Sequence, residues 1–334
     1  MKGSLLDGLP DDARKDTVKA DFPGWMAPML ATLTHQPFSH DDWIFERKFD
    51  GERCLLFKDD GSVRLMSRNR KHMNDTYPEL EKVMVRQPMK QFIIDGEIVA
   101  FEGDITSFGR LQDRMQIKDP DEARRSDVKV YYYVFDICYA DGYDLTGVEL
   151  RHRKGLLRRV LEFEDPVRFT EHRNRDGEAY YQEVCPKGWE GLIAKDATSS
   201  YVHSRSRKWL KFKCVREQEM VIGGFTDPER SRVGFGALLV GYYENGALKY
   251  AGKVGTGYDD ETLGNLRERL DAIEVDEPAY EKDDELPSSH VHWVKPELVA
   301  QIKFTEWTEG GKLRHPVYLG LRDDKGPREV RRES

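Results

Sequence analysis

The chain has 334 residues, of which 34% are charged and 38% hydrophobic, and its formal net charge is −8. At roughly 100–200 residues per domain this length favours two domains, and no apolar run approaches the ~18 residues of a membrane span. Residues 1–20 lack the apolar segment of a secretion signal. Four scattered cysteines without a CxxC pair predict neither a zinc site nor a disulfide framework, so reduced thiols and a cytoplasmic location are expected.

Residues 1–22 are polar and aperiodic, which predicts an N-terminal tail, and a first domain is expected to span residues 23–215. Helical periodicity predicts helices over Pro78–Val85 and Leu150–Leu161. Short apolar or alternating segments bounded by turn residues predict strands over Ile44–Lys48, Cys54–Phe57, Val63–Ser67, Phe92–Phe101, Tyr131–Ile137, Gly191–Ala194 and Trp209–Lys213.

A shift in composition near Arg216–Glu219 places a second domain over residues 216–334. Its predicted strands are Met220–Phe225, Ala237–Tyr243, Leu248–Val254 and Leu298–Trp307, with a helix over Asp259–Ala272. One helix between the third and fourth strands is typical of a small Greek-key barrel of the OB type. The acidic run 271–285 cannot face DNA phosphates, so it marks a side that does not bind nucleic acid.

The segment Glu46-Arg47-Lys48-Phe49-Asp50-Gly51 ends a predicted strand at a lysine, followed by an Asp-Gly turn. Alternation along a strand puts Glu46 and Lys48 on one face. A lysine held rigidly, desolvated and near other cations favours the neutral, nucleophilic amine. Taken alone, the same segment also fits a surface hairpin with a salt bridge.

Further motifs follow along the chain. In order, they are Ser67-Arg68-Asn69, Ile94-Asp95-Gly96-Glu97, Val134-Phe135-Asp136, Glu190-Gly191-Leu192-Ile193-Ala194-Lys195, Arg207-Lys208-Trp209-Leu210-Lys211-Phe212-Lys213 and Gly320-Leu321-Arg322-Asp323-Asp324-Lys325. Alternation in the fifth motif puts Trp209, Lys211 and Lys213 on one face and Leu210 and Phe212 on the core face.

In this order the motifs resemble the signature motifs of the covalent nucleotidyltransferase superfamily, which includes DNA ligases, RNA ligases and mRNA capping enzymes. The resemblance covers nearly all of the chain from about residue 24. It is strongest to ATP-dependent DNA ligases, and among these to the ligase domain of bacterial ligase D and its stand-alone relatives. That closer match lies in residues 24–30, 107–112, 251–257 and 313–316.

The resemblance implies an α+β fold: an adenylation domain of antiparallel sheets with flanking helices, followed by an OB-fold barrel. It implies that Lys48 attacks the α-phosphate of ATP and carries AMP, which then passes to the 5′-phosphate of a DNA break. The resemblance also implies that Glu46 and Phe135 contact the adenine, and that Arg53 and Arg68 contact the ribose or the phosphates. Glu97 and Glu190 would bind a metal ion or the ribose. Lys211 and Lys213, with Arg207 beside them, would neutralise the α-phosphate, and Arg322 and Lys325 would orient the pyrophosphate.

Mg²⁺, with Mn²⁺ as a substitute, is the expected metal, because Mg²⁺ takes one or two carboxylates together with substrate phosphates. The expected partners are nicked or broken double-stranded DNA and a Ku-type end-binding protein or a polymerase/primase module. We expect a monomer, without membrane attachment, associated with a bacterial nucleoid and active in DNA repair or end joining.

Alternatives remain open at this point. An RNA ligase or a capping-type guanylyltransferase shares the fold and the lysyl-nucleotide chemistry, and the nucleotide that labels the protein would separate them. A non-enzymatic nucleic-acid-binding module with a decayed site is a third alternative, against which the intact lysines and carboxylates argue. Phe135 also fits a core position, and Arg207, Arg322 and Lys325 also fit solvated surface positions.

Overall fold

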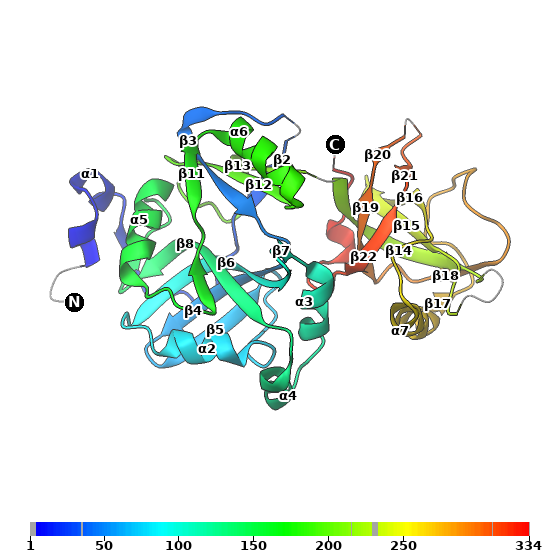
Figure 1. Ribbon diagram of the computed structural model, residues 1–334, viewed down its shortest axis with the longest axis horizontal. Helices are drawn as coiled ribbons and strands as arrows, with labels where there is room; N and C mark the ends of the chain where they lie inside the picture. The colour runs from blue at the N-terminus through cyan, green and yellow to red at the C-terminus, as the bar shows by residue number, and fades with distance from the viewer. Residues whose placement is uncertain (1–4, 35, 215, 229–232, 309, 334) are drawn as a thin grey trace. The chain divides into compact units, whose positions relative to one another are not determined.

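The computed structural model describes residues 5–34, 36–214, 216–228, 233–308 and 310–333. The chain divides into two compact units, Met1–Cys214 and Val215–Ser334 (Figure 1). Each unit has its own hydrophobic core, since no core cluster of the described residues draws members from both. In the described part of the chain no helix is long and apolar enough to cross a membrane.

The start of the chain differs from the predicted tail. Residues from position 5 onward form a 3-10 helix (Leu5–Gly8), a short helix α1 (Asp11–Arg14) and strand β1 (Val18–Lys19), which pairs with β9 (Tyr143–Asp144). Leu9 and Ala13 are buried in the core of the first unit. These two apolar side chains give the segment a place to pack, although it is too short to show a period.

The first unit contains an eight-stranded sheet with the order β1-β9-β8-β6-β4-β5, to which β7 and β10 add at β6 and β8. All its pairs are antiparallel except β8 with β10. Its further strands are β4 (Glu52–Asp59), β5 (Ser62–Ser67), β6 (Gln91–Glu102), β7 (Ile105–Thr106), β8 (Val130–Ala140) and β10 (Val167–Phe169).

Helices α2 (Pro78–Val85), α3 (Phe108–Met115) and α5 (Leu150–Val160) cover one face of this sheet and share its core (Figure 1). A further short helix is α4 (Pro120–Arg125). The helix predicted over Pro78–Val85 is confirmed, as is the one predicted over Leu150–Leu161, which ends one residue earlier. Helix and sheet therefore form on this side where the hydrophobic periods indicated them.

A second, five-stranded sheet has the order β11-β3-β12-β13-β2. Its strands are β2 (Leu30–Leu33), β3 (His40–Lys48), β11 (His172–Arg175), β12 (Gly191–Asp196) and β13 (Arg205–Lys213). One face packs on α6 (Gly177–Val184) and buries Phe212, as predicted. The lysine-bearing face was expected to be the non-core face, yet Trp209 on it is only 2% exposed.

Trp209 is buried because the two sheets of the first unit face each other. A third apolar cluster lies between them and joins Leu55, Phe57 and Phe135 of the eight-stranded sheet to Trp209 of the five-stranded one. Both sheets thus contribute one face to an interior in which polar groups are shielded from water. Shielding strengthens the electrostatic interactions of any charged side chain placed there.

The cysteines correct the expectation that all thiols are reduced. Cys185, in the short 3-10 helix after α6 (Cys185–Lys187), forms a disulfide with Cys214 at the end of β13, and their Cα atoms are 5.1 Å apart. Cys54 and Cys138 are buried free thiols. The two bonded cysteines are 29 residues apart, so only the pairing of β12 with β13 brings them together, and spacing alone gave no sign of it.

The second unit is built on a seven-stranded sheet with the order β16-β15-β14-β18-β17, in which β19 joins β14 to β22. The strands of this unit are β14 (Arg216–Thr226), β15 (Leu238–Glu244), β16 (Ala247–Val254), β17 (Glu274–Val275), β18 (Val291–Val294), β19 (Val299–Phe304), β20 (Glu306–Trp307), β21 (Leu313–Arg314) and β22 (Val317–Leu321).

Helix α7 (Asp260–Asp271) follows the third strand of this unit, as expected for an OB-type fold, and Asp259 caps it by accepting a hydrogen bond from Thr262 N at 2.8 Å. The predicted OB-type barrel is not closed by strand pairs among the described residues, because β16 and β22 do not pair. A hydrogen bond from Tyr318 N to Thr256 O, at 2.9 Å, links the segment after β16 to β22. The sheet is thus open between β16 and β22.

Candidate active site

The strand register of the five-stranded sheet gathers the predicted lysines. Gly191 of β12 lies opposite both Lys48 of β3 and Lys213 of β13, and Ile193 lies opposite both Glu46 and Lys211. Residues directly opposite each other in a sheet point to the same side, and so do residues two apart in a strand. Glu46, Lys48, Lys211 and Lys213 therefore share the face that looks toward the eight-stranded sheet.

Lys48 contacts a carboxylate rather than a group of cations. Its Nζ donates a hydrogen bond to Glu190 Oε1, and the Lys48 side chain is largely buried. Burial alone would lower the pKa of Lys48, but the carboxylates of Glu190, Asp50 and Glu97 outweigh it and raise this pKa above its ordinary value. The structure therefore contradicts the expectation of a neutral amine, because an adjacent negative charge stabilises the ammonium form.

Glu46 is buried between two lysines. Its Oε1 lies 2.6 Å from Lys154 Nζ, and its Oε2 lies 2.6 Å from Lys195 Nζ. Burial raises the pKa of Glu46, but the two ammonium groups outweigh burial and lower it. Burial, and then repulsion from Lys154, lower the pKa of Lys195 to about 8.

Sequence reasoning gave no role to either lysine. Lys195 closes the Glu190–Lys195 motif, so that motif was the available signal. Lys154 lies on α5, more than a hundred residues from Glu46, and no local pattern distinguished it from the other basic residues of that helix. Both side chains are nearly inaccessible to solvent and both contact Glu46. Only the fold therefore shows that they are parts of the site.

Arg53 and Phe135 form the opposite wall, on the eight-stranded sheet. Arg53 donates to both carboxylate oxygens of Asp95 at 2.5 Å and to Met29 O at 3.1 Å. Its guanidinium carbon lies 4.6 Å from the centroid of the Phe135 ring, and Lys195 Nζ lies 4.0 Å from the same centroid. Phe135 belongs to the apolar cluster between the sheets, so it is at once a core residue and a ring flanked by two cations.

The carboxylates predicted to bind metal lie close to Lys48. Glu97 of β6 is opposite Arg53 of β4, and Glu190 is buried beside Lys48. The second oxygen of Glu190, Oε2, is buried and has no hydrogen-bond partner in the described part of the chain. Among those residues, no group of three or more His, Cys, Asp and Glu side chains is arranged to hold an ion.

The remaining predicted residues are Arg68, Arg207, Arg322 and Lys325. Arg68 directly follows β5 and is half-buried, while Arg207 on β13 is exposed. In the second unit, Arg322 forms two 2.8 Å hydrogen bonds with Asp324. Lys325 Nζ lies 3.0 Å from a carboxylate oxygen of Glu219 on β14. Both C-terminal cations are thus paired within their own unit.

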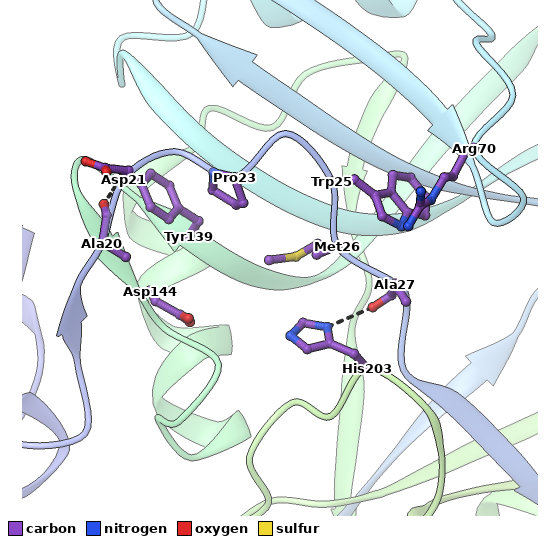
Figure 2. Close-up of a pocket in the computed structure, with 10 residues that line it drawn as sticks. All are labelled: Ala20, Asp21, Pro23, Trp25, Met26, Ala27, Arg70, Tyr139, Asp144 and His203. Carbon is purple, nitrogen blue, oxygen red and sulfur yellow. Dashed lines mark hydrogen bonds between the residues drawn. The ribbon is translucent and has the colours of Figure 1, made fainter.

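A cavity of about 370 Å³ lies in the first unit, along the segment of residues 20–27 (Figure 2). Figure 2 shows Arg70 beside the ring of Trp25, and the Arg70 guanidinium carbon is 5.0 Å from the Trp25 ring. His203 Nδ1 lies 2.9 Å from Ala27 O. None of the predicted site residues lines this cavity, so it is separate from the lysine-bearing face.

Comparison with protein families identifies the architecture that holds this site. Residues 28–213, more than half of the chain, match the ATP dependent DNA ligase domain, and residues 231–325 match the ATP dependent DNA ligase C terminal region. The chain belongs to the ATP-dependent DNA ligase family. The expected nucleotidyltransferase and OB-fold domains are those of this family, and its nucleotide is ATP.

Relatives of known name agree with this membership. The chain is 37% identical over 318 residues to the multifunctional non-homologous end joining protein LigD of Pseudomonas aeruginosa, a match that covers 93% of this chain and 37% of that protein. It is 36% identical over 315 residues to the LigD protein of Mycobacterium tuberculosis, covering 92% of this chain and 40% of that protein. The chain thus spans about two fifths of the length of these relatives.

A solved structure described as mycobacterial DNA ligase D complexed with ATP and MES is similar over 92% of this chain and 98% of that chain, with 34% identity and a TM-score of 0.67. The resemblance inferred from the motifs, to the ligase domain of ligase D, is confirmed by these relatives. The RNA ligase and capping-enzyme alternative is not favoured, because the matched family and the named relatives are DNA ligases.

Proposed function

We propose that this chain seals 5′-phosphate/3′-hydroxyl breaks in DNA with ATP, through a covalent Lys48–AMP intermediate. The observation that carries the proposal is the shared face of β3, β12 and β13, on which Lys48 contacts Glu190 and Lys211 and Lys213 lie across the intervening strand β12. A nucleophile, fixed cations and a proton acceptor are the parts that phosphoryl transfer to a lysine requires.

The proposed reaction begins with loss of a proton from Lys48. Glu190 Oε1 contacts Lys48 Nζ and is the acceptor in place for it. The neutral amine then attacks the α-phosphorus of ATP and forms a P–N bond, while the bond to the departing pyrophosphate breaks. Lys211 and Lys213 balance the negative charge that grows on the phosphoryl oxygens, because they hold fixed positive charge on the same face.

The proposed nucleotide pocket uses the interior between the two sheets. Phe135 offers a ring face for the adenine base, and Glu46 offers carboxylate oxygens whose remaining lone pairs accept from the base edge. Arg53, fixed by Asp95, and Arg68 are assigned to the ribose or phosphates, with Arg207 beside the α-phosphate cations. Arg322 and Lys325 are assigned to the departing pyrophosphate. These roles follow the family motifs, and the contacts described above support those of Glu46, Arg53 and Phe135.

A magnesium ion, or manganese in its place, fits Glu97 and Glu190. The fit rests on Glu190 Oε2, a buried carboxylate oxygen that lacks a hydrogen-bond donor in the described structure, and on the preference of Mg²⁺ for one or two carboxylates completed by substrate phosphates. When bound, the ion would supply positive charge next to the reacting phosphate. The carboxylates of this chain would hold and orient it.

Mapping of a nucleotide label tests the proposal. The protein is incubated with α-labelled ATP and Mg²⁺, digested, and the labelled peptide sequenced. We expect the label on Lys48, none on Lys48→Ala, and normal labelling of Lys82→Ala, which removes an exposed lysine of α2. Labelling by GTP in preference to ATP would instead support a capping-type enzyme, and full labelling of Lys48→Ala would refute the assignment.

We further propose a role in end joining, because two of the relatives are named multifunctional non-homologous end joining proteins. Double-stranded DNA with nicks or breaks is the proposed substrate. A Ku-type end-binding protein or a polymerase/primase module is the proposed partner of a monomeric ligase at a bacterial nucleoid. Gel assays on nicked, cohesive and blunt substrates, with and without such a partner, would test which breaks are joined.

A further inference from the structure

A second cavity in the first unit contains none of the residues assigned to nucleotide transfer. Its volume is about 720 Å³, within the ~300–1,000 Å³ of small-molecule sites. Its lining combines aromatic rings with cations, and the members that matter here are Arg47, Tyr131, Tyr133, Arg168, Lys187 and Trp189. Such a lining suits a ligand that has both a flat ring and a negative charge.

The tyrosines of this cavity reach it through the alternation of β8. Tyr132 is fully buried in the core of the eight-stranded sheet, so its neighbours Tyr131 and Tyr133 point to the other face, where both are half-buried. Tyr133 lies opposite Glu97 on β6. The cavity is therefore a continuation of the sheet face that carries Glu97.

The wall of the cavity continues to the nucleophile. Phe49, the residue after Lys48, packs against Tyr133 with ring centroids 4.2 Å apart. The Arg47 guanidinium carbon lies 5.4 Å from the Phe49 centroid. A molecule bound in the cavity would thus lie next to the segment that carries the proposed AMP.

Cations and rings alternate around the cavity. The guanidinium carbon of Arg47 lies 4.1 Å from the Trp189 centroid, and that of Arg168 lies 3.9 Å from the Tyr131 centroid. Arg168 is ion-paired with Asp165 at 2.6 Å, and Lys187 with Glu183 at 2.7 Å. These two cations therefore have carboxylate partners that partly neutralise them.

Arg47 differs from the other two cations. In the described part of the chain no carboxylate lies within ion-pair distance of it; its Nη2 donates to the main-chain oxygen of Asp104 at 3.2 Å, and its Nε is buried without an acceptor. Buried donors are almost always satisfied by protein, water or ligand. Arg47 thus has no ion-paired carboxylate in the described structure, and the Asp104 carboxylate, whose residue also lines the cavity, acts on it only from farther away.

We propose that this cavity binds an unpaired nucleotide of the DNA end that is being joined, with the base against Trp189 and Tyr133 and the phosphate near Arg47. Aromatic stacking combined with a cationic groove is how proteins hold single strands without sequence preference. The inference rests on the proposed function, because it adds a single-strand subsite to the same DNA substrate. It makes the ligase selective for ends that carry short unpaired extensions.

Fluorescence anisotropy without ATP tests this subsite. The whole chain is titrated against a labelled blunt duplex and the same duplex with a four-thymidine extension on its 3′ or its 5′ strand. Since stacking contributes ~1–3 kcal/mol per base, we expect at least one extended duplex to bind about tenfold more tightly than the blunt one. Equal affinity for all three duplexes would overturn the proposal.

Variants of the rings locate the effect. Trp189→Leu and Tyr133→Leu should each reduce the preference for the extended duplex to about twofold. Tyr143→Leu, which removes another half-buried tyrosine outside the cavity, should keep it. Circular dichroism checks that each variant is folded. An unchanged preference in both folded cavity variants would also overturn the proposal.

Two controls separate the possible ligands and the two hypotheses. If excess ATP changes the tryptophan fluorescence of the wild-type chain but not that of Trp189→Leu, and the extensions add no affinity, the cavity is a site for free nucleotide and the proposal is wrong. Self-adenylation is measured in a separate reaction. If self-adenylation is absent, the proposed ligase chemistry is refuted. The anisotropy result can still be interpreted, because it is measured without ATP, so the two failures are distinguishable.

Discussion

Glu46→Gln is the most informative single change, because it removes one negative charge from between two buried lysines. Glu46, Lys154 and Lys195 are each at most 3% exposed, and both carboxylate oxygens lie 2.6 Å from an ammonium nitrogen. Glutamine has nearly the same shape but no charge. The variant therefore keeps the packing and leaves two mutually repelling ammonium groups without their counter-ion.

The expected cost follows from the burial of the network. Leaving an uncompensated buried charge costs about 3–5 kcal/mol. For a cooperative unit of ~150–250 residues, each kcal/mol lowers the melting temperature by about 2–4 °C, so the first unit should melt about 6–20 °C lower. Self-adenylation should fall as well, since Glu46 is assigned to the adenine.

The loss should depend on pH in a definite direction. The pKa of Lys195 is lowered to about 8 in the folded protein, against about 10.4 for an unfolded lysine, and removal of Glu46 lowers it further. Between the folded and unfolded values the unfolded chain binds more protons, so stability rises with pH there. In Glu46→Gln this rise begins at a lower pH. The deficit relative to wild type should therefore shrink from pH 6.5 to pH 8.5.

Thermal melts at both pH values measure this effect. Glu183→Gln is the matched control, because Glu183 also bridges two cations, Arg173 and Lys187, but on the exposed surface. Its melting temperature should hardly change. Adding Lys195→Met to Glu46→Gln should recover part of the lost stability. Equal melting temperatures for Glu46→Gln and Glu183→Gln at pH 6.5 would show that the buried network of Glu46 and the two lysines does not contribute the expected free energy of unfolding.

Three further outcomes are expected. Phe212→Ala should destabilise the first unit by about 3–5 kcal/mol, since Phe212 is 1% exposed. Lys211→Ala should instead melt at the normal temperature and fail in self-adenylation. The reverse pattern would contradict the strand register. Arg322→Ala should block self-adenylation yet still seal a nick that already carries 5′-adenylate, because pyrophosphate is absent from that step; failure on both substrates would contradict the assigned role. Thiol titration of the denatured, unreduced protein should find two free thiols, with Cys185 and Cys214 unreactive until a reductant is added; four reactive thiols would contradict the disulfide.

Local pattern determined much of this protein. The strand that ends at Lys48, the α2 helix at Pro78–Val85 and the capped α7 helix lie where their hydrophobic periods and end residues indicated. Such elements depend on neighbours in sequence, so the sequence alone suffices. By contrast, β11 (His172–Arg175) is entirely polar, and it is a strand only because it pairs with β3.

The order of the motifs also indicated the ligase family, because residue types at given places in a chain can be read without coordinates. The chemical state of the site could not be read in this way. The motif around Lys48 suggested a neutral amine among cations. The fold instead places Glu190, which directly precedes β12 and is 142 residues away in the chain, against Lys48 Nζ. Charge and proton affinity depend on what lies nearby in space.

The contacts of Lys154 with Glu46 and of Cys185 with Cys214 have the same origin. Each joins residues from elements that are not adjacent in the chain, so their proximity follows from sheet register and helix packing and from no local pattern. Sequence alone determined which residues are present to do chemistry. The tertiary structure decided which of them meet, because burial, ion pairing and disulfide geometry require atoms within a few ångströms that the chain order does not bring together.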